Sequence, residues 1–139
     1  MRPMYENSDT LTAERNVVLT LCDKWNSEAV KLPIAYNVDY GLFRDETLRC
    51  WLEVKCRNCT IGQYETYFIS YKKIVNGLRL ADDSGKPFIL AVQWSDALGW
   101  IKIERSRFEV KIGGRRDRND WQDVEPMAHF KTQDFQLIK

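Results

Sequence analysis

The chain segment formed by residues 48–57 carries charged side chains at a spacing that could support chemistry. Successive side chains of an extended strand point to opposite faces, so Glu53 and Lys55 share one face with Trp51. Opposite charges at i and i+2 on an otherwise apolar strand are expensive to bury unless they serve each other or a bound ion. An exposed strand face with an ordinary ion pair is the alternative interpretation of this segment.

Two further acids are expected close to Glu53. Asp39 belongs to the preceding predicted strand, and a hairpin with its turn near Asp45 brings Asp39 into the neighbourhood of Glu53. Glu14 shares one helical stripe with Val18, which places a carboxylate on the helix face that packs on the sheet. Three carboxylates that converge repel one another and shift toward protonation unless a cation neutralises them.

A magnesium ion suits this predicted group of oxygen ligands, with Mn²⁺ as a substitute. Mg²⁺ is a hard ion that takes one or two carboxylates, keeps several waters and leaves positions for phosphate oxygens. Lys55 beside such an ion would orient or deprotonate the attacking water, or stabilise charge in the transition state. The residues therefore predict metal-dependent hydrolysis of a phosphodiester bond.

The elements that must position these residues follow the order α-β-β-α-β-β-β in one domain over residues 1–139, with residues 1–9 as a loose tail. Apolar spacing predicts helices over residues 10–30 and 61–80. Alternation and apolar runs predict the five strands of this order over residues 34–44, 48–57, 87–94, 100–104 and 108–112, and a further short strand near residues 135–138. The first two strands are expected to pair as one hairpin, and the strands over residues 100–104 and 108–112 as another. The fold class is therefore α/β (α+β), with a mixed central sheet flanked by helices.

This ordered set of residues resembles the PD-(D/E)XK nuclease superfamily, whose restriction-endonuclease-like core has the same order of elements over residues 11–112. The resemblance implies that the side chains of Asp39 and Glu53 and the carbonyl of Val54 bind the metal ion. It also implies that Lys55 is the catalytic lysine and that Glu14 joins the site through water.

The residue before Asp39 departs from the family pattern. Val38 stands where the family motif has a proline. This departure leaves Asp45, in the predicted turn, as an alternative ligand, and Asp39 is preferred because it lies on the strand.

Residues 63–67, Gln63-Tyr64-Glu65-Thr66-Tyr67, resemble the Gln-x-x-x-Tyr signature of RecB-type and lambda-type exonucleases. On the predicted helix Gln63 and Tyr67 share a face at i and i+4, so both could reach one phosphate or base. In those relatives the pair helps to hold the DNA strand at the metal. The wider sequence is similar to small phage-encoded members of the superfamily. This similarity implies a nuclease acting in phage or prophage DNA replication, recombination or processing, with DNA and proteins of those processes as partners.

Other side chains are candidates for contacts with DNA. Trp51 on the predicted active face could stack on a base, although tryptophans in a short chain mainly enlarge the core. Arg115 and Arg116 follow a glycine pair and could bind the phosphate backbone, or belong to a surface loop or subunit contact. Lys72 and Lys73 are expected at a solvated helix end.

The four cysteines are interpreted as reduced thiols rather than as a zinc or iron-sulfur site, and Cys50 and Cys56, which face away from Glu53 on the predicted strand, fit a core role. Structural zinc usually needs a second closely spaced pair of ligands, and the sequence offers one such pair and one histidine. The cysteines are Cys22, Cys50, Cys56 and Cys59.

The composition excludes several other classes of protein. With 44% hydrophobic and 29% charged residues in 139, the chain can bury a core, which excludes a disordered protein. It has no apolar run near the roughly 20 residues of a membrane helix and no signal-peptide pattern, so we expect no membrane partner and a cytoplasmic location in a bacterial host. Residues 1–48 carry three more acids than bases and residues 102–118 four more bases than acids, which suits a metal site next to a polyanion.

A catalytically silent protein that keeps the nuclease fold, and binds DNA or joins a protein complex, is the alternative function. The sequence does not separate exonuclease from endonuclease or junction resolvase. A chain this short has little room for a separate specificity domain, so substrate choice is expected to come from oligomer geometry, loops or a partner, and a homo-oligomer is one of these expectations.

Overall fold

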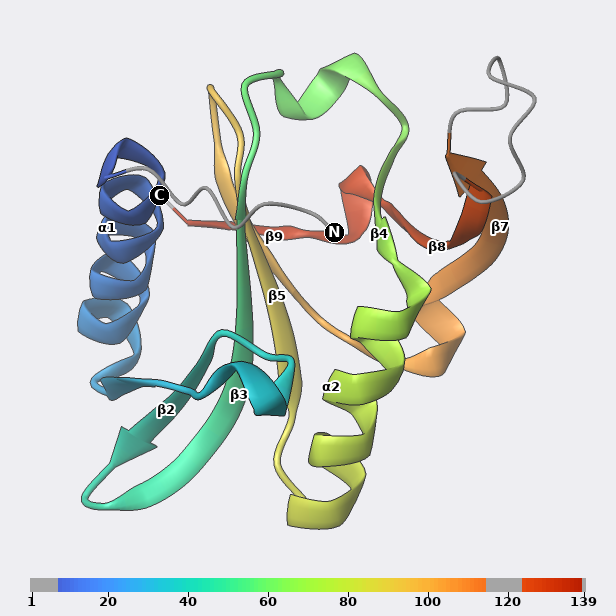
Figure 1. The fold of residues 1–139 in the computed structure, drawn as a ribbon. Helices are drawn as coiled ribbons and strands as arrows, with labels where there is room; N and C mark the ends of the chain where they lie inside the picture. The colour runs from blue at the N-terminus through green and yellow to red at the C-terminus, as the bar shows by residue number, and fades with distance from the viewer. Residues whose placement is uncertain (1–7, 115–123, 139) are drawn as a thin grey trace.

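The structure is a computed structural model that describes residues 8–114 and 124–138 of the chain. A larger sheet has the strand order β1-β2-β3-β5-β6-β9, and a smaller sheet has the order β4-β8-β7 (Figure 1). The larger sheet consists of β1 (Glu28–Lys31), β2 (Tyr40–Arg44), β3 (Thr47–Cys56), β5 (Phe88–Gln93), β6 (Leu98–Lys102) and β9 (Gln136–Ile138). The smaller sheet consists of β4 (Thr66–Ser70), β7 (Phe108–Gly114) and β8 (Val124–Lys131). Strands β3 and β5 run parallel while their neighbours pair antiparallel, so the central sheet is mixed, as predicted.

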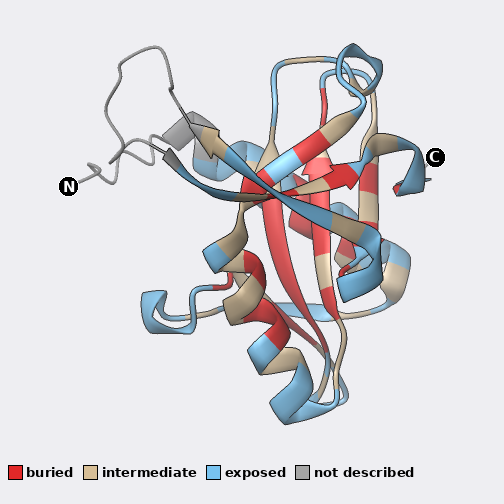
Figure 2. Cartoon of the chain, turned by 90° about the vertical axis from the view of Figure 1, so that its right-hand side faces the viewer, coloured by how far each residue is buried: buried red, intermediate tan, exposed pale blue. Residues whose placement is uncertain are grey.

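Two helices cover opposite faces of the larger sheet (Figure 1). Helix α1 (Ser8–Trp25) packs Val17, Val18 and Leu21 against one face, where Leu52 and Val54 of β3 are also buried. Helix α2 (Tyr71–Ser84) packs on the other face together with the smaller sheet. Figure 2 shows that buried residues concentrate in the central strands between these layers. No helix in the described part of the chain is long and apolar enough to cross a membrane.

The hairpin predicted around Glu53 is confirmed, but its first strand is shorter than the predicted residues 34–44, because residues 34–36 form the 3₁₀ helix η1 and β2 begins at Tyr40. Strands β2 and β3 pair antiparallel from Arg44 opposite Thr47 to Tyr40 opposite Leu52. The two turn residues, Asp45 and Glu46, have φ values of 50° and 65°. Two consecutive residues with positive φ match the right-handed twist of the paired strands, which is why short hairpins use this turn.

The predicted helix over residues 61–80 is wrong in its first half. That segment contains the short 3₁₀ helix η2 (Ile61–Gln63), then strand β4, and only then α2. Tyr67 and Ile69 are buried while Phe68 between them is exposed, which is the period of a strand. Pairing of β4 with β8, which lies some 60 residues later in the chain, overrides the three- and four-residue spacing of the aromatic side chains.

Two other expectations about the elements also need correction. The helix expected to reach residue 30 ends at Trp25, where Asn26 adopts a φ of 48° and the chain turns into β1. The hairpin expected between residues 100 and 112 does not form, because β6 pairs with β5 and β9 while β7 pairs with β8.

The strand predicted near residues 135–138 is confirmed as β9. Most of the predicted tail over residues 1–9 lies outside the described residues.

Short 3₁₀ helices link the other elements. They are η1 (Ile34–Tyr36), η3 (Arg105–Arg107) and η6 (Thr132–Asp134).

Candidate active site

Glu53 is a fully buried charged residue in the middle of the larger sheet. Its side chain has an exposed fraction of 0%. The carboxylate atom Oε2 lies 2.9 Å from Nζ of Lys73 on α2 and 3.5 Å from Nζ of Lys55 on β3. The side chains of Lys73 and Lys55 are 39% and 27% exposed, so both lysines lie between the buried carboxylate and the solvent.

Asp39 lies next to Glu53 because it directly precedes β2, at the end of the pairing between β2 and β3. The last paired residues are Tyr40 and Leu52, so continuing the antiparallel register sets Asp39 opposite Glu53. At this position the side chain of Asp39 takes over the hydrogen bonding: the Val54 N–H donates to Oδ2 at 2.9 Å. The N–H and C=O of one strand residue point to the same edge, so the Val54 carbonyl faces the side on which Asp39 lies.

The alternative acid, Asp45, is far from this group along the hairpin. It lies in the turn between β2 and β3, at the opposite end of β2 from Asp39. The structure therefore brings Asp39, and not Asp45, to Glu53.

The electrostatics of Glu53 follow from its burial. Desolvation raises the pKa of its carboxyl group, and the negative charge of Asp39 raises it further, whereas the ammonium groups of Lys73 and Lys55 act in the opposite direction. Burial lowers the pKa of Lys73, but the charge of Glu53, the hydrogen bond with Glu53 and smaller contributions from Asp39 and Lys55 together outweigh burial, so the pKa of Lys73 is raised overall. The other oxygen of Glu53, Oε1, is buried and has no hydrogen-bond partner among the described residues.

An unpaired buried carboxylate oxygen is costly unless a ligand satisfies it. Here the oxygen belongs to Glu53, with Asp39 close enough for its charge to raise the pKa of Glu53. Two carboxylates and a backbone carbonyl are hard oxygen donors of the kind that Mg²⁺ and Mn²⁺ take, with water and phosphate in the other positions. The residues at this place therefore fit a divalent cation.

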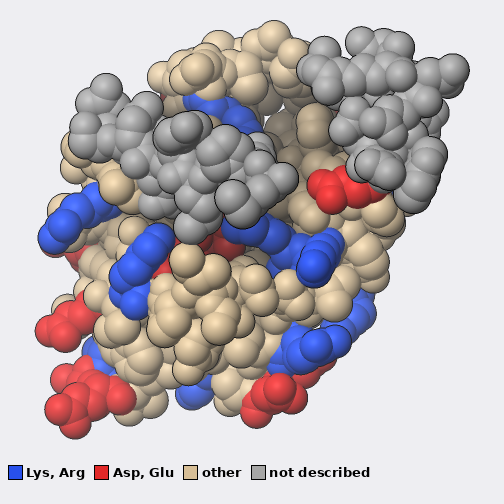
Figure 3. Space-filling model, viewed as in Figure 1, with Lys and Arg blue, Asp and Glu red and all other residues tan. Residues whose placement is uncertain are grey.

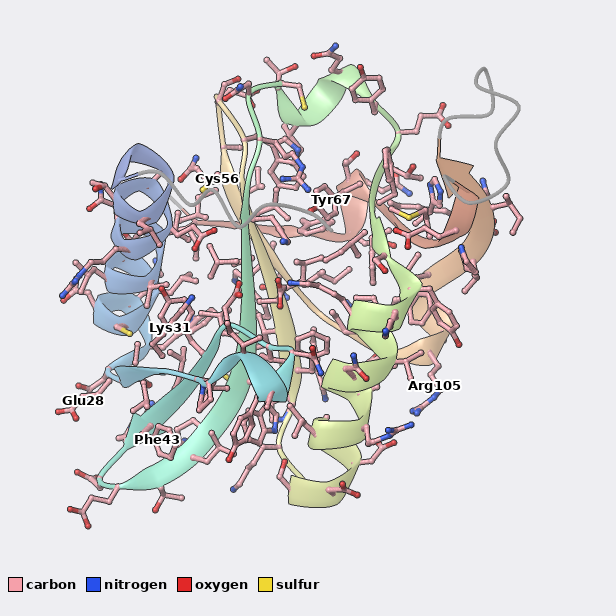
Figure 4. The ribbon with its side chains drawn as sticks, viewed as in Figure 1. Glu28, Lys31, Phe43, Cys56, Tyr67 and Arg105 are labelled. Atoms are coloured by element: carbon pink, nitrogen blue, oxygen red, sulfur yellow. The ribbon has the colours of Figure 1, made fainter. Side chains whose placement is uncertain are left out.

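Glu14 does not form a direct cluster of three acids with Asp39 and Glu53. Within residues 8–114 and 124–138, no three acids, histidines or cysteines lie close enough together to hold a metal ion. Helix α1 covers the face of β3 opposite to Glu53, and there the charge of Glu14 adds to burial in raising the pKa of the Cys56 thiol. Figure 4 shows Cys56 on the α1 side of β3 and Tyr67 on the other side. The helical stripe correctly directed Glu14 toward the sheet, on the side that α1 covers. Its predicted contact with the site through water stays a prediction.

Gln63 and Tyr67 do not share a helix face, so the predicted Gln-x-x-x-Tyr helix is wrong. Gln63 ends η2, and its exposed amide donates to the Tyr64 hydroxyl at 3.3 Å. Tyr67 lies in β4 with its ring buried, and its hydroxyl accepts a hydrogen bond from Arg57 at 2.9 Å.

Trp51 is not available for stacking on a base. Its exposed fraction is 9%, its ring lies 6.3 Å from that of Tyr36, and its Nε1 donates to Ser84 Oγ at 2.9 Å. The remaining predicted DNA contacts, Arg115 and Arg116, lie outside the described residues.

Lys73 is the site residue that the sequence reasoning missed, because it was assigned to a solvated helix end. In α2 it lies one turn before Gly77, which is buried against the sheet. A Cβ atom at Gly77 would overlap the Phe88 ring, so the absence of a side chain lets the helix approach the sheet closely. Lys73 and Gly77 lie at i and i+4 and therefore share one face of α2. A glycine on that face was the sequence feature that could have indicated an inward position for Lys73.

The four cysteines are free thiols. Cys50 is buried, and burial raises its pKa to about 12, so it stays protonated at neutral pH. This agrees with the predicted core role.

The fold and the site together define the class of this protein: a mixed sheet between two helices, with an Asp directly before β2 and a Glu-x-Lys triplet on the adjacent strand β3, as in restriction-endonuclease-like nucleases. A solved structure with this fold is Hjc of the archaeal hyperthermophile Archaeoglobus fulgidus, a Holliday junction resolvase, with a TM-score of 0.62. The match has 15% sequence identity and covers 91% of this chain and 90% of that chain. At such low identity the likeness concerns the fold alone.

The family described as "Phage putative PDDEXK endonuclease" matches residues 1–138. The chain therefore belongs to this phage family of PD-(D/E)XK nucleases, which confirms the resemblance drawn from the sequence. A search of curated proteins finds no match.

Proposed function

We propose that the protein is a DNA nuclease that depends on Mg²⁺ or Mn²⁺ and hydrolyses phosphodiester bonds. Asp39, Glu53 and the Val54 carbonyl would hold the cation. Lys55 would act on the reacting phosphate. A role in phage DNA replication, recombination or processing, and assembly into a homo-oligomer, belong to the same proposal.

The observation that carries this proposal is the unpaired, buried Oε1 of Glu53 beside a second carboxylate. When bound, the cation would supply Lewis acidity and lower the pKa of its water. Asp39 is held in place by its hydrogen bond from the Val54 N–H, so the protein itself positions one carboxylate without the ion.

The position of Lys55 supports the role that we propose for it. Its ammonium lies 3.5 Å from Glu53 and is partly exposed, so it can donate to a phosphate oxygen at the edge of the site. A preorganised ammonium in this place stabilises the negative charge that develops on the phosphate in the transition state. In the view of Figure 3, Lys and Arg side chains lie across the middle of the molecule, and acidic side chains lie along the lower rim with further ones in the middle and at the upper right. The basic band could contact a polyanion.

Cleavage of labelled linear, nicked, single-stranded and branched DNA tests this proposal. We expect products with Mg²⁺ or Mn²⁺ and none with EDTA. Glu53→Gln and Lys55→Met should each lower the rate by about 10²- to 10³-fold, the usual effect of removing one group that stabilises transition-state charge.

The matched control is Glu46→Gln, which neutralises an exposed acid in the turn of the same hairpin. It should cleave like the wild type. Equal cleavage by the wild type and by Glu53→Gln would show that the activity comes from elsewhere.

A silent DNA-binding protein is the second candidate. It is favoured by one observation: two ammonium groups already neutralise Glu53 without a metal ion. DNA binding that is unchanged by EDTA and by Lys55→Ala, with no cleavage of any substrate, would support this candidate.

A further inference from the structure

A small aromatic pocket adjoins the proposed active site along β3. Its volume is about 190 Å³, and it lies between the end of β3, η2 and β4. The residues that form most of its wall are Arg57, Ile61, Tyr64, Tyr67, Phe68 and Trp94. Sites for drug-sized ligands have volumes of roughly 300–1,000 Å³, so this pocket suits a single flat ring system.

The pocket combines a rigid floor with exposed walls. Tyr67 and Trp94 are buried, and their rings meet edge to face at 6.2 Å. Tyr64 and Phe68 border the pocket with exposed fractions of 61% and 54%. Phe68 stacks on the His129 ring at 5.4 Å, and the parts of the Phe68 and Tyr64 rings that stay exposed border the preformed apolar cavity as surface on which a base could stack.

Arg57 connects this pocket to the proposed site. It follows Glu53 and Lys55 at i+4 and i+2, and the alternation of the strand directs all three side chains to one face. Its guanidinium lies 5.2 Å from the centre of the Tyr67 ring and donates to the Tyr67 hydroxyl at 2.9 Å. The step from Lys55 to Arg57 spans about 6.6 Å of strand, which is comparable to one nucleotide of an extended DNA strand.

We propose that this pocket binds one unpaired base of the DNA strand next to the phosphate that reacts, with Arg57 contacting the adjoining phosphate. The inference rests on the proposed function and specifies its substrate class. A base inside a duplex can enter the pocket only after it is unstacked and unpaired, so single-stranded, frayed or branched DNA is favoured over continuous duplex.

The charge pattern favours a nucleotide over an aromatic side chain of a protein partner. Arg57 lines the pocket, and Lys55 and Lys73 add two cationic groups at Glu53. A nucleic acid supplies both the aromatic ring and the phosphate charge that these groups match. Arginine and aromatic rings together are the elements with which proteins bind single strands.

Binding of an oligonucleotide that carries 2-aminopurine tests the pocket without any cleavage. The fluorescence of this base is quenched when it stacks on an aromatic ring. In EDTA, a single-stranded oligonucleotide with one 2-aminopurine should bind the wild type with quenching. Tyr64→Ala and Phe68→Ala should each weaken binding by about 5- to 100-fold, the usual contribution of one stacked base, and reduce the quenching.

The variants are chosen so that folding does not confuse the result. Tyr64 and Phe68 are largely exposed, and the control Leu19→Ala removes a side chain on α1 that is 58% exposed. The control should bind like the wild type. Circular dichroism checks that all three variants keep the fold.

A second arm uses cleavage with Mg²⁺ or Mn²⁺ of a strand with one abasic position next to the cut. We expect the wild type to cleave the intact strand faster than Phe68→Ala does. On the abasic strand most of this difference in cleavage rate should disappear. Unchanged binding and quenching in both pocket variants would overturn the pocket, even if Glu53-dependent cleavage is found. Quenching that depends on the pocket residues, with no cleavage in the presence of any metal ion, would instead support the base-binding pocket and contradict the nuclease activity.

Discussion

The contact between Glu53 and Lys73 gives the most direct test of how this site is built. We predict that Lys73→Met lowers the free energy of unfolding of the metal-free protein, because the buried carboxylate then retains Lys55 as its remaining cationic contact. Methionine keeps the apolar stem of the lysine, so the loss measures the ammonium group more than the packing.

The magnitude follows from the geometry. At 2.9 Å and an effective dielectric constant of about 20, the direct attraction between the two charges is about 6 kcal/mol before desolvation is subtracted. Breaking a fully buried pair costs about 3–5 kcal/mol, whereas exposed pairs contribute about 0.2–1 kcal/mol. Lys73 is 39% exposed and Lys55 partly replaces it, so we expect a coupling energy of about 1–2 kcal/mol.

The assay is a double-mutant cycle of the wild type, Glu53→Gln, Lys73→Met and the double variant. Urea unfolding at pH 7 in EDTA, followed by circular dichroism, supplies the four free energies. The matched control is the cycle for Arg105 and Asp82, a 3.1 Å pair whose side chains are 68% and 60% exposed. Added Mg²⁺ should reduce the effect of Lys73→Met, because a bound cation supplies the charge that the ammonium supplied.

The reasoning is refuted if the coupling of Glu53 with Lys73 is no larger than that of the exposed control pair. That result would mean that burial of Glu53 does not strengthen its contact with Lys73. The inward position of this lysine would then have no energetic consequence.

Three further predictions concern other parts of the fold. Gly77→Ala should lower the free energy of unfolding by about 1–3 kcal/mol, because its Cβ overlaps the Phe88 ring; unchanged urea midpoints would contradict this packing. Cys50, whose pKa burial raises to about 12, should react with iodoacetamide at pH 8 roughly 100-fold more slowly in the folded than in the unfolded chain, as mass spectrometry can measure. Glu14→Gln should speed alkylation of Cys56 by about two- to five-fold, because the charge of Glu14 raises the pKa of that thiol. An unchanged Cys56 rate would place Glu14 away from this thiol.

Part of the site could be predicted because it depends on local geometry. Glu53 and Lys55 share a face through the two-residue period of a strand, and a two-residue turn brings β2 back along β3. Asp39 then reaches Glu53 by simple counting along the hairpin. These statements need only the direction of side chains and the register of neighbouring strands, both of which are encoded in a short stretch of sequence.

The aromatic segment before α2 shows where local patterns fail. Tyr64, Tyr67, Phe68 and Tyr71 satisfy helical spacing, yet Tyr67 and Phe68 lie in a strand that pairs with β8. The hydrogen bonds of β4 come from residues that are distant in sequence, and they outweigh the weak helical preference of the segment. The alternating burial of Tyr67, Phe68 and Ile69 becomes evident only in the tertiary structure, which shows what packs on each face of the strand.

The sequence by itself determined the nuclease family, the Asp39 and Glu53 pair and the position of Lys55 beside it. The tertiary structure alone decided that Lys73 contacts Glu53, that Glu14 lies on the far face of the sheet, and that an aromatic pocket continues from β3. The physical reason is that periodicity states which way a side chain points within its own element. Which surface it meets depends on the face of the sheet that each helix covers, and that is set by packing between segments far apart in the chain.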